Sequence, residues 1–476
     1  MPDKEKDDEL IRRWTKAITV KVREGNRVQY LIDGPNTFKE MYEAILTTFP
    51  YADSSGYYIY LLGWWLDDTF PLTGKSGSSI AALFRQASLR KVQIRVMLWD
   101  QAGSQNTDQI KRVNELPTGA GILDNNTLYL VGAHHQKVLI VKGQRGLIGF
   151  CGGIDINIDR VQAVERQKGS PMHDVHCKIE GDAVHDLVDV FVQRWQAHPD
   201  HRDLDKRKGL LLGLADRTPP GSKPKEIGSQ FVAIARTFNF VGNGKKCAKE
   251  HSIRSTMIGA IRAARRFIYI EDQYLVNFEA AEELKEALKN IQHLTILIPH
   301  SSISDLPHVW WARAQFISIL RHGNQAEKKV RVFYLVTPGP KPFGEHTYVH
   351  AKTWIFDDQL AVIGSANCNE RGWSSDSEVA AAIFDTTPSV YKFSFAQKLR
   401  MQLWEEHLGV KVVDGGLLES ADQWLKASTS PTSKVRLYNP DEGQDSGSST
   451  NLDWNSQVDP SADDLSSCQE VSTVAR

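Results

Sequence analysis

The chain has 476 residues, more than one ordinary hydrophobic core accommodates, so we expect two domains or one bilobal unit. Its 41% hydrophobic and 24% charged residues are typical of a globular protein and exclude a disordered or fibrous chain as a whole. Lysine and arginine number 57 and aspartate and glutamate 58, and this near-zero balance argues against a nucleic acid as partner, because duplex binders carry a basic excess.

The five cysteines are dispersed, odd in number and form no CxxC pair, which argues against a disulfide framework and a cysteine zinc site. The N-terminal sequence MPDKEKDDELIRRW mixes acids and bases without an apolar h-region, so it does not read as a secretory signal. No stretch approaches the ~20 apolar residues of a membrane span. We therefore expect a cytoplasmic monomer whose contact with a membrane is peripheral.

Composition divides the chain into five segments. A Pro/Gly/Ser-rich stretch (DRTPPGSKPK, 216–225) has the signature of a linker between two halves of similar length. Residues 441–470 contain acids but no lysine or arginine, and such a segment cannot bury enough apolar surface to offset its ordering entropy. The predicted segments are a charged N-terminal segment (1–30), a first half (31–213), a linker (214–228), a second half (229–427) and a disordered acidic tail (428–476).

The two halves repeat the same order of elements, as a duplication would. Apolar runs in each half predict strands, and each half closes with an amphipathic helix carrying Trp195 or Trp404. Alternating strands and helices indicate an α/β fold with a buried sheet in each half. Two such halves can pack about a pseudo-twofold axis and build one site together. The matching strands are 57–66 with 267–275, 92–98 with 294–298, 135–141 with 350–356, and 175–179 with 378–384.

The strongest chemical motif is His350-x-Lys352-x4-Asp357 in the second half. In a strand, residues two apart point to the same face, so His350 and Lys352 project toward one site. A glycine turn (GSAN, 364–367) follows and adds the hydroxyl of Ser365 and the carboxamide of Asn367. Imidazole, ammonium and neutral donors together suit a phosphate group.

The first half has His135-x-Lys137 at the equivalent place, followed by a second glycine turn containing Gly153 and Asp155. A single HxK is not specific, because chance alone produces about one copy in this composition. A third copy at 176–178 lacks the downstream glycine turn and is interpreted as an ordinary strand pair. The specificity lies in two copies with matching surroundings.

These motifs resemble the phospholipase D superfamily, whose HxKxxxxD motif occurs once in each half, and most of all eukaryotic-type phospholipase D. The resemblance covers about residues 50 to 410 in the family's order. It implies two homologous α/β/α sandwich halves with one shared active site. The segments that carry it are IYLLGWWL (59–66), VMLWD (96–100), AHHQK (133–137), GGID (152–155), IYIEDQYL (268–275), YVHAK (348–352), IGSANCNERGWSSDSEVA (363–380) and LWEEHLG (403–409).

Two positions depart from the family pattern. Lys142 stands where the first motif usually has aspartate, a residue thought mainly to support local structure. Asp272 stands where the family segment usually has asparagine, and the sequence offers no physical account of that change.

The resemblance implies a two-step reaction in which one histidine forms a phosphohistidine and the other protonates the leaving alcohol. We assign His135 as nucleophile and His350 as acid/base. Lys137 and Lys352 would offset phosphate charge, Ser365 and Asn367 would act as neutral donors, and the motif aspartate Asp357 is included with the catalytic group. The family positions that hydrogen-bond the two histidines correspond here to Asp174 and Glu378, and Asp155 is expected to orient Lys137.

The scheme requires no cofactor and no metal. His134 and His135 are adjacent, and neighbouring strand residues point to opposite faces, so they do not form a metal site together. The expected substrate is a glycerophospholipid such as phosphatidylcholine. Aromatic residues at 64–65 and 310–311 line an apolar mouth or pack in the core. The alternatives are a cardiolipin synthase-like phosphatidyltransferase, a nuclease, and a catalytically dead lipid-binding homologue, the last suggested by Lys142.

Overall fold

The computed structural model describes most of the chain with several gaps. Residues 217–225 of the predicted linker lie outside the described residues, as does the acidic tail from 441 onward except Asp459. The described residues are 2–100, 106–125, 132–161, 172–216, 226–241, 247–303, 309–322, 326–337, 346–386, 393–412, 417–440 and 459.

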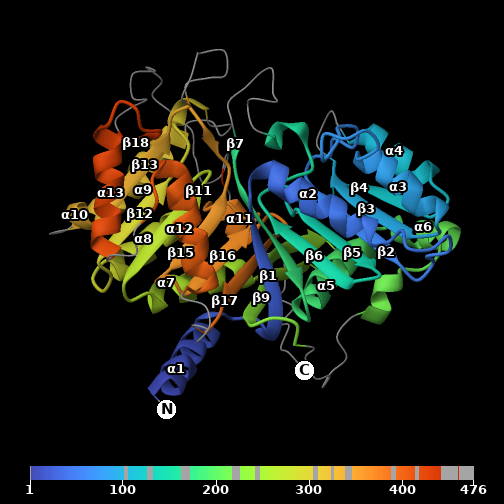
Figure 1. Ribbon diagram of the computed structural model, residues 1–476, viewed down its shortest axis with the longest axis horizontal. Helices are drawn as coiled ribbons and strands as arrows, with labels where there is room; N and C mark the ends of the chain where they lie inside the picture. The colour runs from blue at the N-terminus through green and yellow to red at the C-terminus, as the bar shows by residue number, and fades with distance from the viewer. Residues whose placement is uncertain are drawn as a thin grey trace.

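The two halves share one 16-stranded sheet, which runs from the first half on the right of Figure 1 to the second half on the left. Antiparallel strands β1 and β9 join the halves at the centre. The first-half strands are β1 (Arg23–Ile32), β2 (Tyr58–Gly63), β3 (Gln93–Trp99), β4 (Gly119–Asp124), β5 (Val138–Gly143), β6 (Gly146–Gly152) and β8 (Val175–Glu180). The second-half strands are β9 (Gln230–Val241), β10 (Cys247–His251), β11 (Phe267–Asp272), β12 (His293–Leu297), β13 (Val330–Leu335), β15 (Lys352–Phe356), β16 (Leu360–Gly364), β17 (Glu378–Phe384) and β18 (Val435–Leu437).

The strand order is the same when read outward from the centre in either direction. It runs β1-β8-β6-β5-β2-β3-β4 in the first half and β9-β17-β16-β15-β11-β12-β13 in the second. In both halves the last three strands of this order pair in parallel and the strands before them pair antiparallel. Strand β18 adds an antiparallel edge beyond β13 in the second half. The halves are therefore homologous and related by a pseudo-twofold axis between β1 and β9.

Helices cover both faces of the sheet, which gives each half three layers. In β2, Tyr58 and Tyr60 face the layer that contains α5, whereas Ile59 and Leu61 face α2 and α3. In β11, alternate residues divide in the same way between α12 and α13 on one face and α1, α7, α8 and α9 on the other. The helices are α1 (Pro2–Ala17), α2 (Asp33–Leu46), α3 (Ile80–Leu89), α4 (Thr107–Glu115), α5 (Ala183–Ala197), α6 (His201–Lys208), α7 (Ser252–Ala263), α8 (Phe278–Ala287), α9 (Val309–Arg321), α10 (Ala326–Lys329), α11 (Glu370–Ser374), α12 (Phe395–Leu408) and α13 (Leu417–Thr429).

The local sequence explains why these elements form. Strand β2 (YIYLLG) is buried at every position, so its apolar run has no polar alternation, as expected of a strand covered on both faces. Helix α12 begins after Ser394, whose hydroxyl accepts the backbone N–H of Gln397, and ends at Gly409, which adopts the left-handed conformation. These signals place α12 where the sequence predicts a helix around Trp404.

The predicted boundary between an N-terminal segment (1–30) and the first half does not match the structure. Residues 1–30 are not a separate charged segment, because the C-terminal part of α1 packs against α7 of the second half and β1 is a central strand. Trp14 is fully buried and Arg13 pairs with Asp357. One buried face is sufficient to fix a helix whose other face is highly charged.

The predicted tail also begins too early. Helix α13 extends to Thr429, and β18 pairs with β13, so residues 428–437 belong to the second half. Trp424 and Val435 are fully buried and hold this otherwise polar stretch. Among the described residues, no helix is both long and apolar enough to cross a bilayer.

Candidate active site

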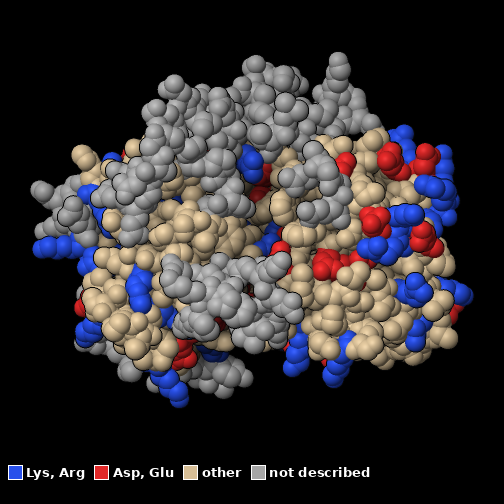
Figure 2. Space-filling model, turned by 90° about the horizontal axis from the view of Figure 1, so that it is seen from above, with Lys and Arg blue, Asp and Glu red and all other residues tan. Residues whose placement is uncertain are grey.

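Each HxK segment lies against the opposite half of the molecule. The backbone N–H of His350 donates to the carbonyl of His173 at 2.8 Å, beside the short parallel pair β7 (Met172–His173) and β14 (Tyr348–Val349). The backbone N–H of His135 donates to the carbonyl of Ser377 at 2.9 Å in the equivalent contact. These contacts bring the two motifs to the junction of the halves, where both basic and acidic atoms are visible in Figure 2.

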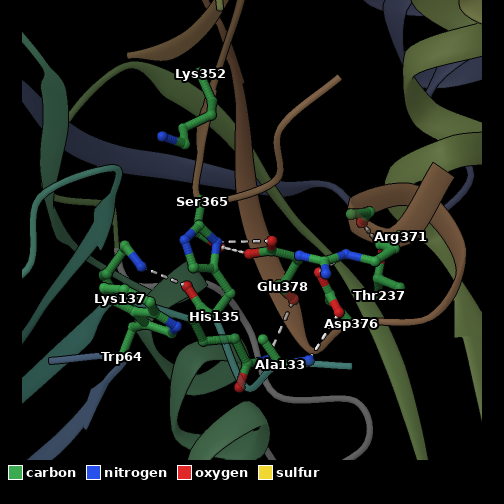
Figure 3. Close-up of polar contacts among 12 residues, drawn as sticks. Trp64, Ala133, His135, Lys137, Thr237, Lys352, Ser365, Arg371, Asp376 and Glu378 are labelled. Atoms are coloured by element: carbon green, nitrogen blue, oxygen red, sulfur yellow. Dashed lines mark hydrogen bonds and ion pairs between the residues drawn. The ribbon is translucent and has the colours of Figure 1, made fainter. Parts of the chain in front are cut away.

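The first half-site is built around His135. Its Nδ1 lies 2.8 Å from Oε1 of Glu378, a second-half residue that begins β17. The hydroxyl of Ser365 donates to the other oxygen of the same carboxylate. Figure 3 shows His135 between Glu378 and Lys137, with Lys352 of the second half nearby. Glu378 is thus held from both sides, and within the described part of the chain Nε2 of the imidazole has no hydrogen-bond partner.

The second half-site mirrors the first. Nδ1 of His350 lies 2.7 Å from Oδ2 of Asp174, which belongs to the first half. Lys352 donates to Oε1 of Gln273 at 2.7 Å and also to the carbonyl of His350. Each histidine therefore takes its carboxylate from the other half, so neither half contains a complete site.

The first-half lysine has its own carboxylate. Nζ of Lys137 lies 3.0 Å from Oδ2 of Asp155, and both residues are buried. Oδ1 of Asp155 accepts the backbone N–H of Trp64 at 2.9 Å. Although burial opposes it, the charges of Lys137 and Arg160 hold the pKa of Asp155 below its usual range. Asp155 thus lies where it orients Lys137.

Burial and charge shift the pKa values of the groups at this junction. Burial and the neighbouring lysines hold the pKa of both His135 and His350 well below the usual range. Burial raises the pKa of Asp174 to about 6 and that of Glu378 to about 7. Burial also lowers the pKa of Lys352 to about 7. A buried cluster of cations at this junction would attract a phosphate monoanion and be stabilised by it.

The glycine and amide of the two turns have distinct roles. A Cβ on Gly153 would lie 2.0 Å from Oδ1 of Asp174, so only glycine leaves room for that carboxylate. Asn367 is buried, and its Oδ1 has no hydrogen-bond partner among the described residues. The Ser365 hydroxyl is engaged by Glu378 rather than left open as a neutral donor to phosphate.

Asp357 does not reach the site, contrary to its inclusion with the catalytic group. It follows β15 at the end opposite His350 and accepts the backbone N–H groups of Arg265, Arg266 and Phe267 at 2.7–3.0 Å. It also pairs with Arg13 at 3.2 Å. Asp357 therefore ties together the ends of two strands and α1.

The two departures from the family pattern now have a physical account. Lys142 pairs with Asp216 at 2.6 Å, so the first half has an ion pair where the second half has a buried carboxylate. Asp272 accepts the backbone N–H groups of Tyr274, Leu275 and Cys368 at 3.0–3.2 Å. As an acceptor of several N–H groups, a carboxylate is well suited to this position.

The sequence reasoning missed Arg160 and Asp376. Arg160 is 6% exposed and lies 3.9 Å from Oδ2 of Asp155, and its charge adds to burial and Lys352 in lowering the pKa of His350. Asp376 accepts the backbone N–H of Ala133 and thereby holds the first motif against the second half. The only available signals were their positions near the two glycine turns.

The remaining candidates from the sequence make other contacts. In the third HxK copy, Lys178 pairs with Glu40, and Nδ1 of His176 accepts the backbone N–H of Ile154 in the first glycine turn. The side chain of His134 contacts Ser377 and Asp124, whereas the imidazole of His135 contacts Glu378. Trp64 stacks on Trp99 with ring centroids 5.7 Å apart and meets His135 edge-on at 6.1 Å. The tryptophans at 310 and 311 belong to α9.

Two family models match overlapping parts of the chain. The model described as "Phospholipase D" matches residues 161–299, and the model described as "Cardiolipin synthase, PLD-like domain" matches residues 257–405. Together the two matches include the second motif and both carboxylates that hold the histidines.

Curated relatives and solved structures agree with the family models. The chain is 26% identical to phospholipase D A of Dictyostelium discoideum over 69% of this chain and 31% of that protein. It is 23% identical to phospholipase D alpha 4 of Arabidopsis thaliana over 82% of this chain and 66% of that protein. It is 25% identical to the major cardiolipin synthase of Bacillus subtilis over 80% of this chain and 73% of that protein. The chain thus spans between about a third and two thirds of the first two relatives. The fold is similar to that of phosphatidylserine synthase from Haemophilus influenzae, with a TM-score of 0.55, 12% identity and coverage of 90% and 92%.

Proposed function

Because the chain belongs to the phospholipase D superfamily, we propose that it transfers the phosphatidyl group of a glycerophospholipid to water or to an alcohol. One observation carries the proposal. His135 and His350 each bond through Nδ1 to a carboxylate of the opposite half, which leaves both Nε2 atoms for chemistry at one phosphorus. Two buried lysines accompany them.

The first step forms a covalent intermediate. The phosphate monoanion, once bound beside His350, favours its protonation, so His350 enters this step as an imidazolium. Nε2 of His135 attacks phosphorus, the bond from phosphorus to the head-group oxygen breaks, and Nε2–H of His350 gives its proton to that oxygen. In the second step His350 takes a proton from water or an alcohol, whose oxygen attacks phosphorus and releases His135. Lys137 and Lys352 offset the negative charge that develops on the phosphoryl oxygens.

The environment of each histidine suits these roles. The lowered pKa of His135 keeps its imidazole neutral and nucleophilic near neutral pH. The side chain of His135 is 14% exposed, against 6% for His350, which favours His135 as the group that substrate meets first. The carboxyl groups of Glu378 and Asp174 hold the tautomer and stabilise the imidazolium that forms.

Two reactions fit this chemistry and differ in the acceptor. Hydrolysis of a phosphatidylcholine-like lipid to phosphatidic acid is the primary proposal, supported by the similarity to phospholipases D. Transfer to a phosphatidylglycerol hydroxyl is the second candidate, supported by the family model and the relative described as cardiolipin synthases. In both cases contact with the lipid surface is peripheral.

The test uses the purified chain with phosphatidylcholine vesicles, ethanol and EDTA. We expect choline and phosphatidylethanol from the wild type and neither product from His350→Ala. A parallel incubation with phosphatidylglycerol vesicles tests the second candidate, whose products are cardiolipin and glycerol. If phosphatidylcholine, phosphatidylglycerol and DNA all remain intact, the chain is a binding homologue and the proposal is wrong.

A further inference from the structure

A second cluster of buried titratable groups lies behind the pair formed by His350 and Asp174. It is centred on His173, whose Nδ1 lies 3.1 Å from Oδ1 of Asp33 and whose Nε2 lies 3.0 Å from Oε2 of Glu271. On α12, His407 places Nε2 2.9 Å from Oε1 of Glu271. The hydroxyl of Tyr269 donates to the same oxygen at 2.6 Å. These residues come from both halves of the molecule and are buried.

Asp33 of this cluster hydrogen-bonds both the backbone N–H and the backbone carbonyl of Asp174. The backbone N–H of Asp174 donates to Oδ1 of Asp33 at 3.0 Å, and its carbonyl accepts the backbone N–H of Asp33 at 2.9 Å. The carbonyl of His173 accepts the backbone N–H of His350 at 2.8 Å. Asp33 has a positive φ of 63°, a conformation that needs such surrounding contacts to persist. A movement of His173 or Asp33 would therefore move Asp174 and His350 together.

We propose that His173, held between Asp33 and Glu271, is a positioning residue that aligns Asp174 with His350. The inference rests on the proposed function, since its purpose is to aim Nε2 of His350 at the leaving oxygen. Through His407, α12 shares in the alignment, so the orientation of the second catalytic histidine depends on contacts between the halves.

The contacts favour a hydrogen-bonded network over a metal centre. Three lone pairs would have to converge on one point to hold an ion. Here the two histidines contact different oxygens of Glu271, and both nitrogens of His173 already face carboxylates. An imidazolium with two N–H donors satisfies all of these contacts.

The charges around His173 keep it protonated. Although burial opposes protonation, Glu271 and Asp33 hold the pKa of His173 well above its usual range. Glu406 lies 3.7 Å away on α12, and His407 and Asp174 complete the set of titratable neighbours. A raised pKa means that the stabilising contribution is present below the unfolded pKa and is lost as the pH rises through the folded value.

The test compares Glu271→Gln with a matched control, Asp358→Asn. The control breaks a buried bidentate pair with Arg400, which anchors the same helix α12 at a place with no contact to Asp174. For Glu271→Gln we expect a fall in kcat of about tenfold to a hundredfold, because a misplaced catalytic group loses about that much. We expect KM to stay within about twofold of the wild-type value. We expect the alkaline limb of the pH profile of kcat to shift to lower pH than in the wild type. The control keeps the wild-type pH profile.

Three results separate the possible outcomes. Equal kcat and equal pH profiles in Glu271→Gln and wild type would overturn the positioning role while leaving the proposed function intact. If the wild type acts on no lipid, ¹⁵N NMR of the histidine ring nitrogens tests the network directly. In the wild type without lipid, the network requires His173 to be protonated on both nitrogens and His350 to be protonated on Nδ1 alone. Both states should be lost in Glu271→Gln. One zinc ion bound per purified chain, lost in Glu271→Gln, would replace the network with a metal site.

Discussion

The two halves solve the same structural problem at the end of the HxK strand in different ways. In the second half, fully buried Asp357 accepts three backbone N–H groups and pairs with Arg13. In the first half, Lys142 pairs with Asp216, and their side chains are 33% and 15% exposed. Despite this difference, both histidines and both lysines reach the junction. The motif aspartate therefore supports strand ends, and its replacement by Lys142 leaves His135 and Lys137 in place at the junction.

Removal of either catalytic histidine gives the largest expected effect. If the half-sites are equal partners, His135→Ala and His350→Ala each lower kcat by about 10³-fold or more, because each removes a group that acts directly in the reaction. The measurement is lipid turnover, with thermal unfolding as the check on folding. Near-normal turnover in His135→Ala alone would mean that the first half is dispensable.

Removal of the lysines tests whether both halves contribute charge. Lys137→Met and Lys352→Met are each expected to lower kcat by about 10²–10³-fold, the usual effect of losing a donor to a developing negative charge. Lys178→Met is the matched control, since Lys178 belongs to the third HxK copy and pairs with Glu40. Its kcat stays within about twofold of the wild type. A similar loss in the control would point to general damage to the first half.

The two strand ends are expected to differ in stability. Asp357→Asn removes the negative charge of a buried side chain that pairs with Arg13 and accepts three backbone N–H groups. This change is expected to lower the free energy of unfolding by about 3 kcal/mol. Lys142→Met removes a partly exposed ion pair and changes the free energy of unfolding by less than about 1 kcal/mol. Urea unfolding measures both. Equal losses in the two variants would contradict the distinction drawn between the halves.

The carboxylate of Glu378 gives a smaller effect that depends on pH. Burial raises its pKa from 4.5 to about 7, so its protonated form stabilises the fold at low pH and this contribution is lost as the pH rises through 7. Glu378→Gln cannot lose that proton. Between pH 5 and pH 8, the wild type should lose about 2.5 kcal/mol of unfolding free energy relative to the variant. A constant difference across this range would show that Glu378 is ionised throughout.

Local patterns in the sequence were enough to predict which side chains of each motif lie together. Alternation in each strand predicted that His350 and Lys352 share a face, and the repeated order of elements predicted two halves. The family resemblance predicted that Asp174 and Glu378 hold the two histidines. It did not predict that each carboxylate holds the histidine of the opposite half, and no local pattern encodes contacts between distant segments. The cluster around His173 was missed for the same reason, since its members come from four separate segments.

The predicted domain boundaries are wrong where a few residues determine whether a segment packs onto the fold. Trp14 and Trp424 each bury one large side chain and so fix a segment that is otherwise charged or polar. Average composition over a window hides such single anchors. Asp357 was misplaced because motif spacing gives no sign that β15 carries it to the opposite end from His350.

The central claim is that one phosphatidyl-enzyme intermediate forms at a site shared by both halves. The most direct test offers vesicles of phosphatidylcholine or phosphatidylglycerol to the enzyme at a fixed ethanol concentration and measures the ratio of phosphatidylethanol to phosphatidic acid. A common intermediate has lost the head group, so the account predicts the same ratio from both lipids. A ratio that changes with the departing head group would contradict it, because water or ethanol would then attack while the original head group is still attached.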